Sequence, residues 1–193
     1  MHKKMKKVFL LVWALAVLPL AAQSESEDLL PEWTFTTGIE GAAHDEQGNI
    51  YACNFGQQGT IGIVKDGKAS LFATLPEGSI GNGIVFDRAG NMYIADYTGH
   101  NILRIKKGQN TPEVFAHNAA MNQPNDLAIS PMTGIIYAAD PDWKNSKGQL
   151  WIVRPDGKIE LLEGNMGTTN GIEVSPDGRR LYVNEPVTAS EEE

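Results

Sequence analysis

This chain of 193 residues has few cysteines and few cations, and it shows no helical periodicity after its first 22 residues. Cys53 is the only cysteine, so an internal disulfide is excluded. A glycine-rich phosphate loop, a serine nucleophile elbow and zinc-ligand spacing are also missing, which removes the common motifs of nucleotide-binding proteins, serine hydrolases and zinc proteins. Lys and Arg number 16 against 24 Asp and Glu, a balance that argues against nucleic acid as a partner.

The first 22 residues have the pattern of an export signal. Four lysines between positions 3 and 7 precede an uncharged run from Val8 to Ala22 that ends in small residues. This run is too short for a membrane-spanning helix, which needs about 20 residues. We therefore expect cleavage near Ala22 and a periplasmic or secreted product, residues 23–193, free of the membrane and with a net charge of −12. A hydrophobic anchor that stays attached is the alternative.

A strand–turn–strand pattern recurs four times in the remaining chain. The copies begin at Glu40, Asn82, Asn125 and Asn170, which are 42, 43 and 45 residues apart. Five residues after each start stands an Asp or Ser, followed by a turn and an apolar strand such as I-Y-A-C-N or M-Y-I-A-D. Periods of this length are typical of propellers, and both the period and the pattern exclude leucine-rich and all-helical repeats.

Each period also predicts two further strands, joined by turns that contain Gly, Asp or Pro. We expect these strands at residues 60–64, 69–75, 101–105, 112–117, 149–153 and 158–162, with one more at 33–37. Four strands a period make one blade, so the sequence predicts an all-β, incomplete β-propeller of about three and a half blades. Because a propeller closes on itself, we expect the chain to be a fragment, a frameshifted reading or half of an assembly.

The four repeat starts are the main candidate site. Equivalent positions of successive blades point into one central channel, so Glu40, Asn82, Asn125 and Asn170 are expected to face a common axis. One carboxylate and three amide oxygens suit a hard cation such as calcium. Asn-Gly and Asn-Asp also favour turns by themselves, so the pattern alone leaves both interpretations open.

The chain from Phe35 to Glu185 resembles the first half of the senescence-marker protein/gluconolactonase/luciferin-regenerating-enzyme family. The similarity is carried by I-E-G from Ile39, Q-P-N-D from Gln123, the intervening I-Y-A-A-D-P, and T-N-G-I-E-V-S-P-D-G from Thr169. It implies a six-bladed propeller with one divalent ion in the channel, usually calcium, with zinc, manganese or magnesium as other choices. It also implies a gluconolactonase-like hydrolase that opens lactones or related esters.

The resemblance assigns roles to particular residues. It makes Glu40, Asn125 and Asn170 metal ligands, and it leaves Asn82 as a channel-lining residue. The family's remaining ligand, an Asp that acts as base or nucleophile, is expected one blade later, so the catalytic residue stays unassigned in this chain. Gln123 stands where sugar-acid lactonases of the family place an Arg, and the uncharged amide is expected to weaken selection of anionic substrates.

Three further residues complete the candidate set as channel or substrate-lining positions: Asp126, Asp140 and Trp143. Loop shaping is the simpler interpretation of Asp140 and Trp143. His44, His100 and His117 share no repeat position, so a histidine metal site has no support. Three functions compete: a calcium-dependent lactone hydrolase, a non-enzymatic propeller that binds protein or carbohydrate, and an inactive truncated remnant. The oligomeric state is not specified by the sequence.

Overall fold

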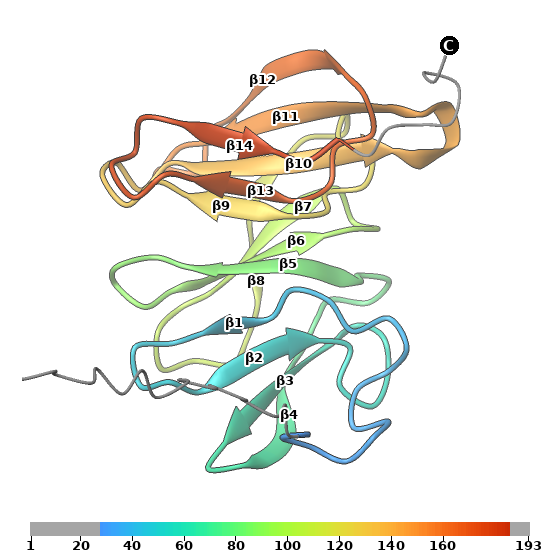
Figure 1. Ribbon diagram of the computed structural model, residues 1–193, viewed down its shortest axis with the longest axis vertical. Coiled ribbons are helices and arrows are strands. Elements are labelled where there is room, and N and C mark those ends of the chain that lie inside the picture. Colours follow the sequence, from blue (N-terminus) through green and yellow to red (C-terminus); the bar gives the residue numbers. More distant parts are fainter. Residues whose placement is uncertain (1–27, 186–193) are drawn as a thin grey trace, which may run out of the picture.

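A computed structural model of the protein describes residues 28–185 (Figure 1). The predicted signal peptide lies outside the described residues. Three four-stranded antiparallel sheets and one two-stranded sheet follow one another along the described chain. The one helical element there is a 3-10 turn at Trp143–Asn145, and no helix within residues 28–185 is long and apolar enough to cross a membrane.

The strands of each sheet pair in the order in which they occur in the chain. The first sheet contains β1 (Ala43–His44), β2 (Ile50–Cys53), β3 (Thr60–Lys65) and β4 (Lys68–Thr74). The second contains β5 (Gly81–Phe86), β6 (Met92–Asp96), β7 (Asn101–Ile105) and β8 (Glu113–His117). The third contains β9 (Leu127–Ile129), β10 (Ile136–Asp142), β11 (Lys147–Val153) and β12 (Ile159–Met166). The last pair is β13 (Ile172–Val174) and β14 (Leu181–Val183).

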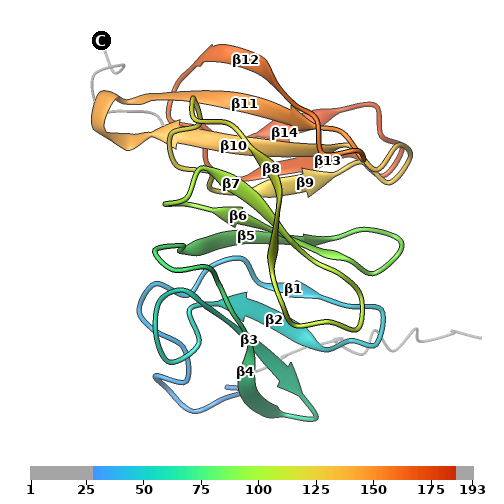
Figure 2. The same ribbon diagram turned by 180° about the vertical axis from the view of Figure 1, so that it is seen from behind.

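The sheets follow one another along the long axis, with the first sheet at one end and the third sheet at the other, where the two-stranded sheet lies beside β9 and β10 (Figures 1 and 2). Contacts join the first strands of neighbouring sheets, β1 to β5, β5 to β9 and β9 to β13. Each sheet is therefore one propeller blade with its first strand innermost. The predicted fold, an all-β propeller with about three and a half blades in this chain, is confirmed.

The hydrophobic core lies between the blades. Ile61, Ile94 and Leu103 pack at the junction of the first two blades, and Ile102 and Trp151 pack at the next junction. Every residue of β6 is buried because neighbouring blades cover both faces of this sheet. Shortening the fully buried Ile94 to Ala would cost about 2–5 kcal/mol, since the closely packed junction cannot collapse around the gap.

The turn between the first two strands is built by a side-chain network that recurs in the first two blades. Asp45 accepts the backbone N–H groups of Gln47 and Asn49 at 2.9 Å each, the Asn49 amide at 2.7 Å and the Tyr51 hydroxyl at 3.0 Å. Burial acts to raise the pKa of Asp45, but these hydrogen bonds outweigh it, and the pKa lies below its usual value. Asp87 makes the corresponding contacts to Asn91.

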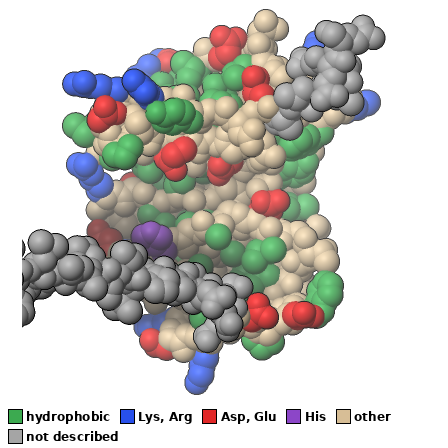
Figure 3. Space-filling model, in the orientation of Figure 1, with side chains coloured by type: hydrophobic (Ala, Val, Ile, Leu, Met, Phe, Trp, Pro, Cys, Tyr) green, Lys and Arg blue, Asp and Glu red, His purple; other side chains and the backbone are tan. Residues whose placement is uncertain are grey.

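One predicted strand is absent from the structure, and another is longer than expected. Residues 33–37 contribute only a single bridge between Phe35 and Phe55. In contrast, β12 continues to Met166 through the polar residues that follow Leu162. On the surface, acidic side chains are spread over the face seen in Figure 3 and alternate with hydrophobic ones.

Candidate functional site

The first strands define two rims of the described chain. We call the rim where each first strand begins the start rim; it carries Glu40, Asn82, Asn125 and Asn170. We call the opposite rim, where first and second strands meet, the turn rim; it carries Asp45, Asp87, Ser130 and Ser175. In Figure 1, β9 and β13 run from the start rim on the right to the turn rim on the left.

The backbone of the repeat starts is held by the second strand of the same blade. The Glu40 carbonyl accepts the N–H of Cys53 at 2.9 Å. The N–H of Asn125 donates to Ala139 at 2.8 Å, and the N–H of Asn170 donates to Asn184 at 2.9 Å. Asn125 and Asn170 thus make equivalent backbone bonds, whereas Glu40 is bound through its carbonyl oxygen.

Further hydrogen bonds join each repeat start to the next blade. The Cys53 thiol donates to the Asn82 carbonyl at 2.9 Å, and the Gly83 N–H donates to the Asn125 carbonyl at 2.7 Å. The Asp126 carboxylate accepts the N–H of Ile172 at 3.0 Å. Hydrogen bonds at or next to the repeat starts therefore join each blade to the next.

The close approach of neighbouring repeat starts requires glycine. Gly41 has a φ of 62°, and a Cβ atom there would lie 1.9 Å from the Asn82 carbonyl oxygen. A Cβ at Gly83 would lie 2.8 Å from Cα of Asp126. The glycines after Glu40 and Asn82 therefore let neighbouring blades approach. A Cβ at Gly171, after Asn170, would make only ordinary contacts at 3.9 Å, and Asn125 is followed by Asp126.

The side chains of the repeat starts remain available for a ligand. Within residues 28–185, Glu40, Asn82, Asn125 and Asn170 make no side-chain hydrogen bond, and Glu40 makes no ion pair. Asn125 is only 9 % exposed, but no fully buried polar side-chain atom of the described residues lacks a partner, so its amide still reaches solvent. A carboxylate and amide oxygens without other partners fit a hard cation.

No group of three or more His, Cys, Asp and Glu in the described part of the chain could hold a metal ion. A cation at the start rim would therefore depend on the amide oxygens of Asn residues as well as on Glu40. The chemistry of this donor set favours calcium or magnesium over zinc, because zinc prefers nitrogen and sulfur ligands.

Asp126 adds a second carboxylate to the start rim. Its Oδ1 accepts the N–H of Leu127 at 2.9 Å, while its Oδ2 accepts the N–H of Ile172. Burial raises the pKa of Asp126, and the neighbouring carboxylate of Glu173 acts in the same direction, whereas the two N–H groups act to lower it. Asp126 thus ties the third blade to the fourth, and its oxygens are already engaged.

The other predicted lining residues fall into two environments. Gln123 is partly buried in the loop before Asn125, and its N–H donates to Asp140 at 2.7 Å. Asp140 is fully buried at the start rim, where its carboxylate is enclosed by donors. Trp143 is 40 % exposed and lies in the 3-10 turn at the tip of the β10–β11 hairpin, on the same rim.

A polar residue at the same repeat position, near the end of each second strand, holds the loop that leads to the repeat start. Asn54 donates to the Gly38 carbonyl at 2.6 Å, and Asp96 accepts the Ser79 hydroxyl at 2.9 Å. Asp140 accepts the N–H groups of Asn122 and Gln123, and Glu185 accepts the N–H of Gly167 at 2.7 Å. Loop shaping, the simpler interpretation of Asp140 from its sequence, is therefore confirmed, and the polar residue that ends each of the motifs Y-A-C-N, Y-I-A-D and Y-A-A-D is its signal.

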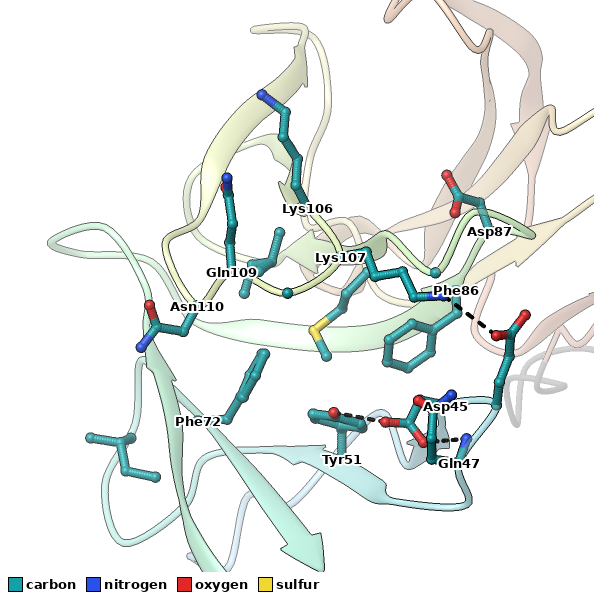
Figure 4. A pocket seen from close by; sticks show the side chains of 16 residues that line it. Asp45, Gln47, Tyr51, Phe72, Phe86, Asp87, Lys106, Lys107, Gln109 and Asn110 are labelled. Carbon is teal, nitrogen blue, oxygen red and sulfur yellow. Dashed lines mark hydrogen bonds and ion pairs between the residues drawn. The ribbon is translucent and has the colours of Figure 1, made fainter.

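A cavity of about 710 Å³ lies on the turn rim, away from the repeat starts. Figure 4 shows Tyr51, Phe72 and Phe86 pointing into it between the first two blades. The ring of Tyr51 packs against Phe72 and Phe86 at centroid distances of 5.0 and 5.3 Å, and Lys107 reaches Glu46 at 3.5 Å. A Cβ atom placed on Gly108, which lines this cavity, would have no neighbour within 4 Å. At the junction between the second and third blades, a Cβ atom on Gly157 would lie 2.8 Å from the Phe115 carbonyl oxygen, so the two blades are in contact there.

Comparison with known proteins identifies relatives of the chain. The family model described as SMP-30/Gluconolactonase/LRE-like region matches residues 70–190. A gluconolactonase of Zymomonas mobilis is 28 % identical over 124 residues, which cover 56 % of this chain and 34 % of the relative. The peptidyl-glycine alpha-amidating monooxygenase A of Xenopus laevis is 27 % identical over 97 residues, which cover 46 % of this chain and 10 % of the relative. The chain thus spans about a third of the gluconolactonase that it matches.

Solved structures share the fold. A gluconolactonase from Xanthomonas campestris has a TM-score of 0.65 at 22 % identity, covering 81 % of this chain and 56 % of that chain. The calcium-binding protein regucalcin from Agrobacterium tumefaciens has a TM-score of 0.64 at 19 % identity, covering 80 % and 52 %. At these identities the similarity establishes the propeller architecture and leaves the chemistry to the residues of the site.

Proposed function

Because the chain belongs to the SMP-30/gluconolactonase/LRE-like family, we propose that its start rim is the divalent-cation site of a gluconolactonase-type lactone hydrolase. One observation carries the proposal. Four polar side chains stand at the same repeat position on neighbouring blades, and within residues 28–185 they make no side-chain hydrogen bond. A rim with only a structural role would not need oxygen-bearing side chains at the same repeat position of each blade that form no hydrogen bonds.

Glu40, Asn125 and Asn170 would hold the cation, which we propose to be calcium. Calcium takes about six to eight oxygen ligands, so three side chains leave several positions to water or substrate. A site with a single carboxylate is weakly charged, and we expect a dissociation constant that is roughly millimolar. When bound, the cation would supply polarisation of a lactone carbonyl oxygen, which favours attack by water.

The remaining residues of the start rim would bind and orient the substrate. Gln123 offers an uncharged amide, which suits a neutral lactone better than a sugar acid. Trp143 offers an aromatic face for the substrate ring at the tip of the β10–β11 hairpin. Asn82 would line the channel between Glu40 and Asn125 and provide a further hydrogen-bonding group.

We do not assign the base to a carboxylate of the described residues. Asp140 is fully buried among hydrogen-bond donors, and both oxygens of Asp126 accept backbone N–H groups. A general base must reach the proton that it abstracts, which the buried Asp140 does not, and no motif of the family matches Asp126 as the base. The predicted place of the base remains the blade that follows Asn170 in the family's propeller.

We also propose that the protein acts in the periplasm or outside the cell. The basic start, the short apolar run and Ala21-Ala22 support this location. Intact-mass spectrometry after expression in a Gram-negative host should find a chain that begins near Gln23. A chain in the membrane fraction that retains Met1 to Ala22 would contradict the proposal.

Calcium titration and a lactone assay test the function together. Calorimetry should detect calcium binding to the wild-type chain, and Glu40→Gln and Asn170→Ala should abolish it. Glu46→Gln removes the same charge at the turn rim, where its pair with Lys107 is exposed, and should leave binding unchanged. Any hydrolysis of aldonolactones by the wild-type chain should vanish in EDTA. Calcium-independent turnover, or full binding by Glu40→Gln, would contradict the proposal.

A further inference from the structure

We propose that Asp140 is a positioning residue that fixes the spacing between Asn125 and Asn170, an inference that rests on the proposed cation site. Asp140 touches neither the cation nor the substrate in this account. It connects the two loops that carry these amides, and it does so through its side chain on one side and through its backbone on the other.

The side chain holds the loop that leads to Asn125. The Asn122 N–H donates to both carboxylate oxygens at 2.9 Å, and the Gln123 N–H donates to Oδ1 at 2.7 Å. Asp140 is 0 % exposed, so these charge-assisted bonds are shielded from water. Two consecutive N–H groups bound by one carboxylate leave the loop little freedom two residues before Asn125.

The carboxylate itself is held by two side chains of β11. The Gln149 amide and the Trp151 indole N–H each donate to Oδ2 at 2.8 Å. The Gln149 amide also donates to the Ala120 carbonyl at 2.7 Å, which adds a second tie to the same loop. The position of Asp140 is therefore set by its own sheet, and the loop follows it.

The backbone of Asp140 reaches the other loop. Its N–H donates to the Thr169 hydroxyl at 3.2 Å, across the junction between the third and fourth blades. Thr169 is 0 % exposed and directly precedes Asn170. The buried Asp140 thus links the segment just before Asn125 to the residue just before Asn170.

Asp96 provides a matched control from the same repeat position in the second blade. It is also 0 % exposed and accepts the Ser79 hydroxyl, the Gly99 N–H at 3.0 Å and the Asn101 amide at 2.8 Å. Its side chain holds the loop before Asn82, and these hydrogen bonds stay within the second blade. An Asp→Asn change at either position removes the same charge from an equally buried place.

Hydrogen exchange and calcium affinity test the inference. Asp140→Asn should speed amide exchange in 118–125, where the carboxylate binds the loop, and weaken calcium binding by about 10- to 100-fold. It should leave 167–172 unchanged, because the backbone N–H that reaches Thr169 is retained. Asp96→Asn should speed exchange in 76–82 alone and leave the affinity unchanged. Unchanged exchange in 118–125 in Asp140→Asn, or equal loss of affinity in the two variants, would overturn the inference.

A second pair of variants covers the case in which Asp140→Asn does not fold. Thr169→Val removes the hydroxyl that accepts the Asp140 N–H and should speed exchange in 167–172, whereas Thr169→Ser should restore the wild-type rate. An unchanged rate in Thr169→Val would overturn the inference. If the wild-type chain binds no calcium, the proposed function fails, and the exchange pattern alone decides whether Asp140 couples the two loops.

Discussion

The Cys53 thiol donates a hydrogen bond of 2.9 Å to the backbone carbonyl of Asn82, across the junction between the first two blades. The only cysteine of the chain thus joins the first two blades. Its N–H donates to the Glu40 carbonyl and its thiol to the Asn82 carbonyl, so it contacts two repeat starts. Burial raises the pKa of the Cys53 thiol, and the negative charge of Glu40 raises it further. The thiol therefore stays protonated and shielded in the folded protein.

This environment makes Cys53 a reporter of blade separation. At about pH 8 the native protein should react with a thiol reagent far more slowly than the protein in urea, because the thiolate is the reacting species. A cysteine introduced at the exposed Ser70 gives the rate for an accessible thiol. Labelling of native Cys53 as fast as that reference would show that the junction is open in solution.

The glycine of the first repeat start predicts a large and specific loss of stability. Gly41→Ala places a Cβ atom 1.9 Å from the Asn82 carbonyl oxygen at a φ of 62°, so the two blades must separate. We expect a cost of about 3 kcal/mol or more in the free energy of unfolding, measured by urea denaturation.

Gly48→Ala is the control for that measurement. Gly48 has a φ of 78° and no neighbouring atom within 4 Å, so only the left-handed backbone conformation is penalised. Its cost should be about 1 kcal/mol. Equal costs at the two positions would mean that the close approach of Gly41 to the second blade does not exist in solution.

The turn network predicts a particular dependence of stability on pH. Burial, together with the hydrogen bond to Asp45, raises the pKa of Tyr51 to about 12, whereas an unfolded tyrosine titrates near pH ~10. Because the folded pKa is the higher one, the contribution of Tyr51 to stability is complete below pH ~10 and is lost as the pH rises towards about 12. Tyr51→Phe should cost about 1 kcal/mol near neutral pH, and this difference should shrink in alkaline solution.

Tyr137→Phe is the matched control in the third blade. Ser130 replaces the Asp there, and the Tyr137 hydroxyl makes no hydrogen bond within the described residues. Its loss should change the free energy of unfolding by less than about 0.5 kcal/mol. A cost of Tyr51→Phe that does not change between neutral and alkaline pH would contradict the assigned network.

Much of the fold could be predicted because its signals are local. The turn residues and the apolar strands recur at a fixed period, and the strand Asn101–Ile105 has the bounds that its pattern indicated. Two strand predictions differ from the structure. Residues 33–37 have strand-like composition but meet a partner only at Phe55, and β12 continues through Glu163, whose polarity conceals the pairing with Leu150.

The candidate site was only partly readable from the sequence. The register of Glu40, Asn82, Asn125 and Asn170 follows from the repeat, but the absence of hydrogen-bond partners for their side chains in the described chain needs coordinates. The link that Asp140 makes between two loops could not be predicted, because its partners include two backbone N–H groups and a hydroxyl 29 residues away. Every residue except proline has a backbone N–H, so a pattern of residue types does not show which N–H groups a carboxylate will bind.

The central claim is that the repeat starts converge on one divalent cation. Crystals of the protein soaked in millimolar calcium, measured at a long X-ray wavelength, would locate the ion by its anomalous scattering. The account predicts one peak on the start rim, about 2.3–2.6 Å from a carboxylate oxygen of Glu40 and from the amide oxygens of Asn125 and Asn170. A calcium peak bound elsewhere, with the start rim occupied by water alone, would contradict it.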